Sequence, residues 1–276
     1  MALTADARDA LQKTSRTFFI PISRLPDGLQ EAIGAAYLCL RAIDEIEDHP
    51  RLDHETKVEL LHGVSLGLQA QTSVAGFQHA AFTQLFEPHR ACLPEVSLRL
   101  GEWACMPSAL IAPRIWEATA AMAERMAYWA ANGWTIRDEA DLNRYTFGVA
   151  GAVGLLLCDL WAWFDGRQLA RAHAIEFGRG LQATNILRNR TEDLARGVDF
   201  FPAGWSAAQM QAYARKNLES AEAYARGMPS DAFQYLLELP LALAYATLDS
   251  LARGQSKLSR SAVLKIMQQF RQISPM

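Results

Sequence analysis

Apolar residues along this chain recur every three or four positions, the spacing that places side chains on one face of an α-helix. The pattern is interrupted by prolines and by Asp-Gly and Asn-Gly pairs, which are typical of turns and helix ends. No segment alternates apolar and polar residues for long enough to predict a strand. We therefore predict an all-α fold, with helices over residues 31–46, 54–68, 82–100, 115–128, 138–164, 171–193, 206–228, 231–253 and 261–271.

Prolines and glycines set the expected limits of these helices. After a short polar start, Pro21 and Gly28 predict a loop before the first helix. Pro50 should end that helix, because the residue before a proline is biased away from helical geometry. Pro240 should kink or break the helix over residues 231–253. The sequence has no repeat and no linker long enough to divide it, so we predict a single domain over residues 1–276.

Acidic side chains gather at the end of the helix predicted over residues 31–46, where four carboxylates stand in five positions. Asp44 and Asp48 are one helical turn apart on one face, with about 5–6 Å between their Cβ atoms. Like charges at this spacing repel, and the helix C-terminus adds a partial negative charge. A Mg²⁺ ion that joins carboxylates to substrate phosphates would offset this charge. The alternative is a solvated acidic helix end.

A second polar stripe lies on the helix predicted over residues 171–193. Its members follow one another at steps of three and four, which places them on one face: Gln182, Asn185, Asn189 and Asp193. Arg188 and Arg190 flank the stripe. Helix bundles build metal sites from side chains on facing helices, so the two stripes are candidates for one functional site.

Composition narrows the possible functions. At 276 residues and 50% hydrophobic content, the chain can bury a large core. A net charge of -3 and a pI near 6.1 give no basic patch for nucleic acid, and we expect no nucleic-acid partner. The four cysteines are widely spaced without a C-x-x-C pair, which fits a reducing compartment. The N-terminus lacks the pattern of a signal peptide, and we expect a cytoplasmic protein.

One segment imitates a membrane span. Residues 146–164 are almost wholly apolar and reach the roughly 18 residues that a span requires. Gly148, Gly151 and Gly154 on nearby turns suit a buried helix that passes close to another. Asp159 near the far end argues against a lipid-facing helix, because a carboxylate inside a membrane is costly. We expect no membrane span.

Four segments taken together resemble a known family. They are residues 15–18, 37–48, 145–154 and 182–193, and they resemble, in order, motifs of the squalene/phytoene synthases, the head-to-head isoprenyl transferases. Residues 40–48, Leu-Arg-Ala-Ile-Asp-x-x-Glu-Asp, look closer to the squalene branch, which implies C15 farnesyl rather than C20 substrates. The resemblance implies an isoprenoid-synthase-type helical bundle around a central apolar cavity.

The resemblance implies a metal site. Asp44 and Asp48 match the aspartates that hold Mg²⁺ on the substrate diphosphates, and Asp193 matches the last aspartate of the second motif. Glu47 and Asn189 complete the expected metal set. Asn189 stands where family members usually carry aspartate, so the second motif has lost a charged ligand. An asparagine side chain still offers a carbonyl oxygen to Mg²⁺.

Other matched positions concern the substrate diphosphate. Arg16, Arg41 and Arg188 match arginines that hold diphosphate oxygens, for which the planar guanidinium is well shaped. Gln182 and Asn185 match the amide pair beside the second motif. These five residues are the expected polar contacts to a prenyl diphosphate.

The remaining matches concern the reacting end and the prenyl tail. Tyr145 matches a tyrosine assigned to first-step chemistry, where it steers ionisation or takes a proton near the carbocation. Its alternative role is a core tyrosine with a satisfied hydroxyl. The face that carries Gly148, Gly151 and Gly154 would line a channel for prenyl tails, with Phe18 as one neighbour.

The implied activity is Mg²⁺-dependent, head-to-head condensation of farnesyl diphosphate to a presqualene- or squalene-type C30 product. Asn189 keeps two alternatives open, because related all-α cyclases use an asparagine in their second metal motif. These are a class I terpene cyclase that ionises one prenyl diphosphate, and a non-catalytic partner subunit that binds it. The sequence has no glycine-rich dinucleotide fingerprint and leaves the use of NADPH open. It also leaves open the oligomeric state and a peripheral membrane contact for product release.

Overall fold

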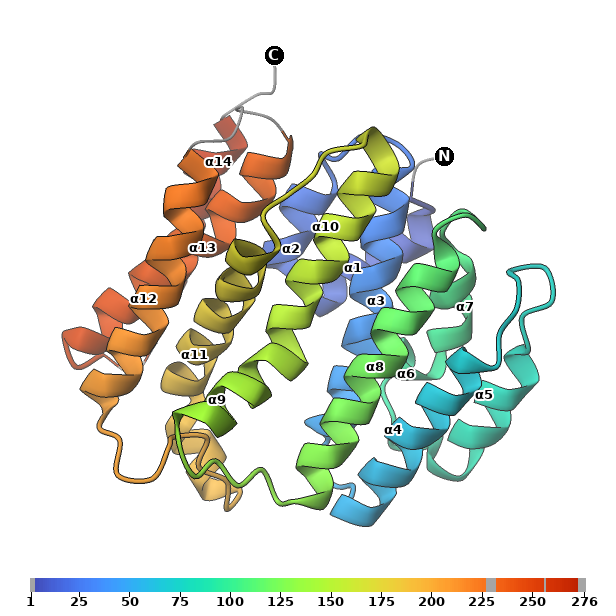
Figure 1. Ribbon diagram of the computed structural model, residues 1–276, viewed down its shortest axis with the longest axis horizontal. Helices are drawn as coiled ribbons and strands as arrows, with labels where there is room; N and C mark the ends of the chain where they lie inside the picture. The colour runs from blue at the N-terminus through green and yellow to red at the C-terminus, as the bar shows by residue number, and fades with distance from the viewer. Residues whose placement is uncertain (1–2, 227–231, 256, 273–276) are drawn as a thin grey trace. The chain divides into compact units, whose positions relative to one another are not determined.

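Figure 1 shows the computed structural model of the protein, which describes residues 3–226, 232–255 and 257–272. All regular secondary structure in this part of the chain is helical, and the all-α prediction is confirmed. Contacts group the chain into two compact units, which are described separately below. Unit 1 consists of Met1–Phe19, Leu25–Trp134 and Leu156–Leu169, and unit 2 of Ile20–Arg24, Thr135–Leu155 and Ala170–Met276. The single-domain prediction stays a prediction.

Helix α3 is the most extensively buried helix of unit 1, and it packs against α1, α4, α6, α7 and α8. Its isoleucines, leucines and alanines follow the helical spacing seen in the sequence, so apolar side chains cover most of its surface. The elements of unit 1 are α1 (Ala5–Thr14), α3 (Leu29–Glu47), α4 (His54–Gln69), α5 (His79–Phe86), η1 (Glu87–His89), α6 (Glu95–Leu98), α7 (Leu100–Cys105) and α8 (Ala112–Ala131). Helices α2 (Arg16–Ile22) and α10 (Ala152–Asp165) have residues in both units.

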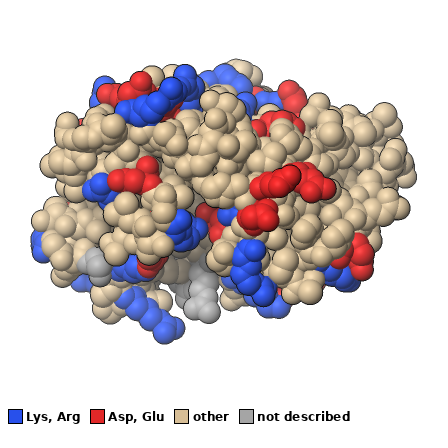
Figure 2. All heavy atoms as spheres, turned by 90° about the horizontal axis from the view of Figure 1, so that it is seen from below, with Lys and Arg blue, Asp and Glu red and all other residues tan. Residues whose placement is uncertain are grey.

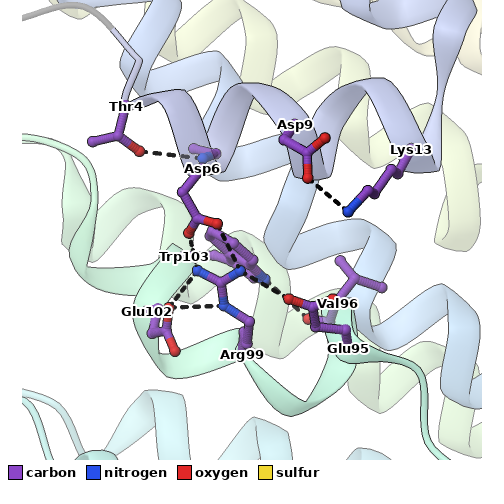
Figure 3. Close-up of polar contacts among 10 residues, drawn as sticks. Thr4, Asp6, Asp9, Lys13, Glu95, Val96, Arg99, Glu102 and Trp103 are labelled. Atoms are coloured by element: carbon purple, nitrogen blue, oxygen red, sulfur yellow. Dashed lines mark hydrogen bonds and ion pairs between the residues drawn. The ribbon is translucent and has the colours of Figure 1, made fainter.

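An ion-pair cluster joins α1 to the short helices α6 and α7 (Figure 3). Arg99, between α6 and α7, pairs with Asp6 of α1, with Glu95 at 3.1 Å and with Glu102 at 2.7 Å. Its guanidinium carbon lies 4.2 Å from the ring centroid of Trp103. The three acids are well exposed, and exposed pairs contribute about 0–1 kcal/mol each. The cluster therefore sets the orientation of α1 more than its stability.

Helix α11 has the corresponding place in unit 2, where it packs against α9, the π-helical turn η2, α12 and α13. Glycines allow this close approach. A Cβ at Gly154 would lie 2.1 Å from the carbonyl oxygen of Ala174, and a Cβ at Gly178 would lie 2.4 Å from that of Ala150. The elements of unit 2 are α9 (Glu139–Thr146), η2 (Phe147–Gly151), α11 (Arg171–Ala195), α12 (Ala207–Arg226), α13 (Ala232–Ala252) and α14 (Arg260–Gln272).

The glycine-bearing face has a different role from the predicted one. At Gly154 the backbone of α11 already fills the space, and a Cβ at Gly151 would lie 3.3 Å from the carbonyl oxygen of Ile175. The expectation that these two glycines line a prenyl channel is therefore wrong. Their missing side chains let two helices of unit 2 come into backbone contact.

Prolines account for one difference from the predicted helices. The helix expected over residues 82–100 is divided into α5, η1, α6 and α7, because Pro88 and Pro94 cannot donate a backbone hydrogen bond. Elsewhere proline is tolerated. Helix α2 continues through Pro21 to Ile22, and α13 continues through Pro240, whose neighbours Leu239 and Leu241 are buried. The break allowed for at Pro240 does not occur, since packing outweighs one lost hydrogen bond.

Two further differences are local. Helix α1 forms in the short polar start, where no helix was predicted, and its N-cap Thr4 accepts a hydrogen bond from the backbone N–H of Ala7. The helix expected over residues 138–164 contains the π-helical turn η2. Such turns are rare and occur frequently at functional sites.

The segment Glu139–Asp165 has the length and hydropathy of a membrane span, alone among the helices that the structure describes. Core helices of soluble proteins share both properties, so this finding is weak. The expectation that the segment does not span a membrane stays a prediction.

Charged side chains are mixed in sign on the face shown in Figure 2. Lysines and arginines there are interspersed with acids and with neutral surface, in keeping with the net charge of -3. A nucleic-acid-binding face would gather its basic residues into one area. The exclusion of a nucleic-acid partner rests on this charge pattern and stays a prediction.

Candidate active site

The side chains of α3 that are not buried form a single stripe. Tyr37, Arg41, Asp44 and Glu45 are half-buried, and Asp48 at the C-cap is exposed. All other side chains of the helix are buried. Tyr37, Arg41, Asp44 and Asp48 follow one another at steps of three or four residues and share one face, and Glu45 lies beside Asp44 at its edge. The segment that carries the first matched motif therefore presents a polar face on an otherwise buried helix.

Arg41 stands in the middle of this stripe and pairs with both Asp44 and Glu45. Its Nε is buried and has no hydrogen-bond partner among the described residues. A buried donor without an acceptor is destabilising by about 1–3 kcal/mol. Burial and the charge of Asp48 raise the pKa of Asp44, although Arg41 opposes the shift. The stripe thus contains one unsatisfied donor and an excess of negative charge.

The donor atoms of the stripe suit Mg²⁺. Asp44 and Asp48 offer carboxylate oxygens one helical turn apart, and Mg²⁺ prefers oxygen ligands and keeps several waters. Within the described part of the chain, no three His, Cys, Asp or Glu side chains converge as a metal-binding group. Mg²⁺ commonly takes only one or two carboxylates together with substrate phosphates.

Glu47 differs from its neighbours because it is buried, about 100° round the helix from Asp48. The indole N–H of Trp134 donates to Glu47 Oε1 at 2.8 Å. Lys57 Nζ donates to the backbone carbonyl of Glu47 at 2.6 Å. Burial raises the pKa of Glu47 to about 8, although the hydrogen bond from Trp134 opposes the shift. Its expected role as a metal ligand stays a prediction.

Aromatic side chains lie at the N-terminal end of the stripe. The ring of Phe18 is 5.9 Å from that of Tyr37, centroid to centroid, and Phe18 is half-buried. Burial raises the pKa of Tyr37, and hydrogen bonding to Ser15 opposes the shift. The side chain of Arg16 lies outside the described residues, so its expected contact with a diphosphate stays a prediction.

The second stripe lies on α11, as its spacing predicts. Gln182, Asn185 and Asn189 are half-buried, and Asp193 near the helix end is buried. The side-chain oxygen of Asn189 accepts a hydrogen bond from Nε of the exposed Arg188 at 3.1 Å. An ion pair joins Asp193 to Arg196. This stripe therefore carries fewer acidic side chains than the stripe of α3.

The sequence singled out Arg190 only as a neighbour of this stripe, and the structure gives it specific partners. Its guanidinium pairs with Asp199 at 2.9 Å and lies 3.7 Å from the ring centroid of Phe201. Its Nε is buried without a hydrogen-bond partner among the described residues. The loop that follows α11 is thereby held against the helix. The available signal was a Phe-Phe-Pro segment that begins ten residues after Arg190.

Tyr145 is buried at the end of α9, directly before Thr146 and the π-helical turn. Its ring stacks on that of Phe200, with centroids 4.8 Å apart and an angle of 20° between the planes. The stack restricts the ring and therefore the direction of its hydroxyl. Phe200 follows α11 in the chain, so the loop after the second motif contributes to the position of Tyr145.

The candidate residues therefore form two groups, one in each unit. Unit 1 holds Arg16, Phe18, Arg41, Asp44, Glu47 and Asp48, and unit 2 holds Tyr145, Gln182, Asn185, Arg188, Asn189 and Asp193. Trp134 and Lys57 of unit 1 and Phe200 of unit 2 were missed by the sequence, because their partners are distant along the chain.

Comparison with known proteins identifies the family. The family model for squalene/phytoene synthase matches residues 11–212. The chain belongs to this family. The squalene synthase of Schizosaccharomyces pombe is 30% identical over 201 residues, which are 70% of this chain and 42% of that protein. The squalene synthase of Dictyostelium discoideum is 31% identical over 202 residues, 70% of this chain and 46% of that protein. The chain spans less than half the length of these curated relatives.

Solved structures share the fold of this family member. The complex of TcSQS with the ligand BPH1237 has a TM-score of 0.76 at 22% identity and covers 96% of this chain and 85% of its own. A dehydrosqualene synthase in complex with ligand has a TM-score of 0.65 at 17% identity, covering 97% and 94%. These similarities confirm the predicted all-α fold of the isoprenoid-synthase type. The central apolar cavity that the resemblance implied stays a prediction.

Proposed function

We propose that this protein is a Mg²⁺-dependent prenyltransferase that joins two molecules of farnesyl diphosphate head-to-head into a presqualene- or squalene-type C30 product. Membership of the squalene/phytoene synthase family supports the reaction type. The similar proteins of Schizosaccharomyces pombe and Dictyostelium discoideum are squalene synthases, which supports the C15 substrate.

The polar stripe of α3 carries the proposal. The buried Nε of Arg41 lacks an acceptor among the described residues, and a diphosphate oxygen is the acceptor that a guanidinium fits well. Asp44 and Asp48 add two carboxylates, and Mg²⁺ commonly joins such carboxylates to a substrate phosphate. An unsatisfied donor and a stripe with more acids than bases are together suited to a metal-bound diphosphate.

The chemistry gives each group a role. Ionisation of an allylic diphosphate builds negative charge on the leaving group, and groups that strengthen their contacts as this charge grows lower the barrier. Mg²⁺, when bound, supplies positive charge to the phosphate oxygens. In unit 1 we assign Asp44 and Asp48 as Mg²⁺ ligands. In unit 2 we assign Asn189 and Asp193 as the Mg²⁺ ligands of the second motif. Arg41 binds diphosphate oxygens directly.

The remaining diphosphate contacts belong to the other matched polar residues. We assign Arg16 and Arg188 to diphosphate oxygens, because each offers a guanidinium within a matched motif. In unit 2, Gln182 and Asn185 are assigned to offer side-chain amides to a diphosphate. Both amides are half-buried on the stripe of α11, where a polar ligand would satisfy them.

Tyr145 is assigned to the first step, in which it steers ionisation or takes a proton near the carbocation. Its stack on Phe200 restricts the ring, so that the hydroxyl keeps one direction while the substrate reacts. The carbocation must also be protected from water. Apolar side chains such as Phe18 are proposed to cover the prenyl tail.

The products formed from farnesyl diphosphate test this function. The purified protein is incubated with farnesyl diphosphate and Mg²⁺, with and without NADPH, and the extract is analysed by mass spectrometry. We expect a C30 product that forms only with the divalent ion. Comparison of the two extracts shows whether NADPH takes part. The absence of both turnover and farnesyl diphosphate binding would contradict the proposal.

A second candidate function is a class I terpene cyclase acting on one prenyl diphosphate. The observation that favours it is Asn189, whose side-chain oxygen accepts a hydrogen bond from Arg188 rather than contributing a carboxylate charge. A C15 hydrocarbon or alcohol from the same incubation would identify this activity. Binding of farnesyl diphosphate without turnover would instead identify a non-catalytic partner subunit.

A further inference from the structure

The loop after α8 contains a strained residue. Trp134 has a φ of 49°, and no other non-glycine residue that the structure describes has a positive φ. Bulky side chains rarely adopt this conformation, and strain of this kind persists where surrounding contacts enforce it. The backbone N–H of Trp134 donates to the carbonyl of Trp129 at 2.9 Å, and the side chain is buried.

The buried indole of Trp134 reaches the end of α3. Its N–H donates to Glu47 Oε1 at 2.8 Å, across 87 residues of sequence. Lys57 Nζ lies 5.2 Å from the indole centroid, and the ring of His54 packs edge-on against it at 5.0 Å. Trp134 and Lys57 therefore both contact Glu47, the residue directly before Asp48, and His54 packs against Trp134.

The backbone carbonyls at the C-terminal end of α3 also have hydrogen-bond partners. The last carbonyls of a helix have no partner within the helix, and that of Glu47 accepts from Lys57 Nζ at 2.6 Å. One turn earlier, the carbonyl of Asp44 accepts from the backbone N–H of Asp48 at 2.9 Å. Helix ends usually fray, but this one is held by its backbone and by a buried side chain.

We propose that Trp134 is a positioning residue for the acidic motif, and that Glu47 serves as its anchor rather than as a metal ligand. The hydrogen bond between them fixes the last turn of α3, so that Asp44 and Asp48 stay one turn apart on the exposed stripe. The inference rests on the proposed function, because it takes Asp44 and Asp48 as the Mg²⁺ ligands. The strained backbone of Trp134 is retained because the indole reaches Glu47 from that conformation.

The experiment compares two tryptophan variants. Trp134→Phe removes the indole N–H and keeps an aromatic ring, whereas the control Trp116→Phe removes a buried indole N–H that donates to the carbonyl of Ala104 at 2.7 Å. Binding of inorganic pyrophosphate is measured calorimetrically at a series of Mg²⁺ concentrations, and thermal unfolding is recorded in parallel. We expect Trp134→Phe to raise the required Mg²⁺ concentration about tenfold, the lower end for residues that orient metal ligands.

The control should separate positioning from stability. Trp116→Phe is expected to lower the unfolding temperature comparably, because it also loses one buried hydrogen bond, and to leave the Mg²⁺ requirement unchanged. Equal Mg²⁺ requirements in the two variants would overturn the positioning role. If the unsubstituted protein shows no Mg²⁺-dependent pyrophosphate binding, the proposed function fails and this inference fails with it.

Two variants of Glu47 test the anchor. Glu47→Gln keeps a side-chain oxygen that accepts from Trp134, whereas Glu47→Met leaves the indole N–H without an acceptor. An anchor predicts that Glu47→Gln binds Mg²⁺ and pyrophosphate more tightly than Glu47→Met does. A loss in Glu47→Gln as large as that in Asp48→Asn would make Glu47 a ligand and overturn the assignment.

Discussion

Helices α3 and α11 have similar positions in their units, but their polar faces differ in charge. Each packs against several helices of its own unit and carries one of the two matched motifs. On α3, the two aspartates and Glu45 outnumber the one arginine of the stripe. On α11, Asn189 bonds to Arg188, and Asp193 is paired with Arg196. We infer that dependence on a cation resides mainly in α3.

The largest expected effect is on the aspartates of α3. Asp44→Ala or Asp48→Ala should lower turnover of farnesyl diphosphate by about 10³-fold or more, since each removes a group that supports charge on the leaving diphosphate. Circular dichroism should show an unchanged helical fold. Asp9→Ala is the control, because Asp9 pairs with Lys13 on the exposed face of α1. Full activity of either variant in excess chelator would contradict the metal assignment.

The next effect concerns Tyr145 in unit 2. Tyr145→Phe removes only the hydroxyl, and a catalytic role predicts a fall in turnover of about 10²-fold, the usual range for a positioned proton-transfer group. Steady-state kinetics and thermal unfolding are measured together. Tyr213→Phe is the control, because it loses a hydrogen bond to Asn143 of 2.8 Å in the same unit. Unchanged turnover with a stability loss of about 1 kcal/mol would favour a core role for Tyr145.

A third effect is the pH dependence of the free energy of unfolding, measured without metal. It should come from the acids of α3, because the amides of α11 do not titrate. The pKa of Glu47 is raised from 4.5 to about 8 in the folded protein. Between these values the folded state binds a proton that the unfolded state releases, so stability falls as pH rises. We expect a loss of about 1–3 kcal/mol from pH 5.5 to pH 8. Glu47→Gln should reduce this loss and leave the part that comes from Asp44, whose pKa is also raised.

Chemical denaturation of both proteins at the two pH values measures this difference. The same pH response in the substituted and unsubstituted proteins would show that the carboxyl of Glu47 keeps its ordinary pKa in the fold. Tyr213→Phe is the control, because it removes no group that titrates between pH 5.5 and pH 8. It should retain the pH response of the unsubstituted protein.

The smallest expected effect is on Asn189, the position at which the second motif has lost a charge. Asn189→Asp should lower the Mg²⁺ concentration for half-maximal activity about threefold, because ion affinity rises with the number of charged ligands. If the asparagine serves a cyclase reaction, the variant should instead change the product ratio. Thr191→Asp adds the same charge at an exposed position of α11 and is the control. Unchanged metal dependence, products and rate would place Asn189 outside the metal shell.

Much of the fold could be predicted because its signals are local. The limits of α3, α4, α8 and α11 lie within a few residues of those expected from apolar periodicity. The residues of each polar stripe share a helix face because their spacing requires it. The division of residues 82–100 was not predicted, because the apolar spacing runs through the whole segment. The missing backbone N–H groups of Pro88 and Pro94 are the signal that divides it.

The sequence by itself determined the helical class, the family and the two polar stripes. Periodicity depends only on neighbouring residues, and the motifs and their order can be read directly from the chain. Only the tertiary structure decided which residues support them. The hydrogen bond from Trp134 to Glu47, the stack of Tyr145 on Phe200 and the contact of Gly154 with α11 join residues that lie far apart in the chain. Such contacts arise when buried groups must find partners and space in a close-packed interior, a condition that no local pattern records.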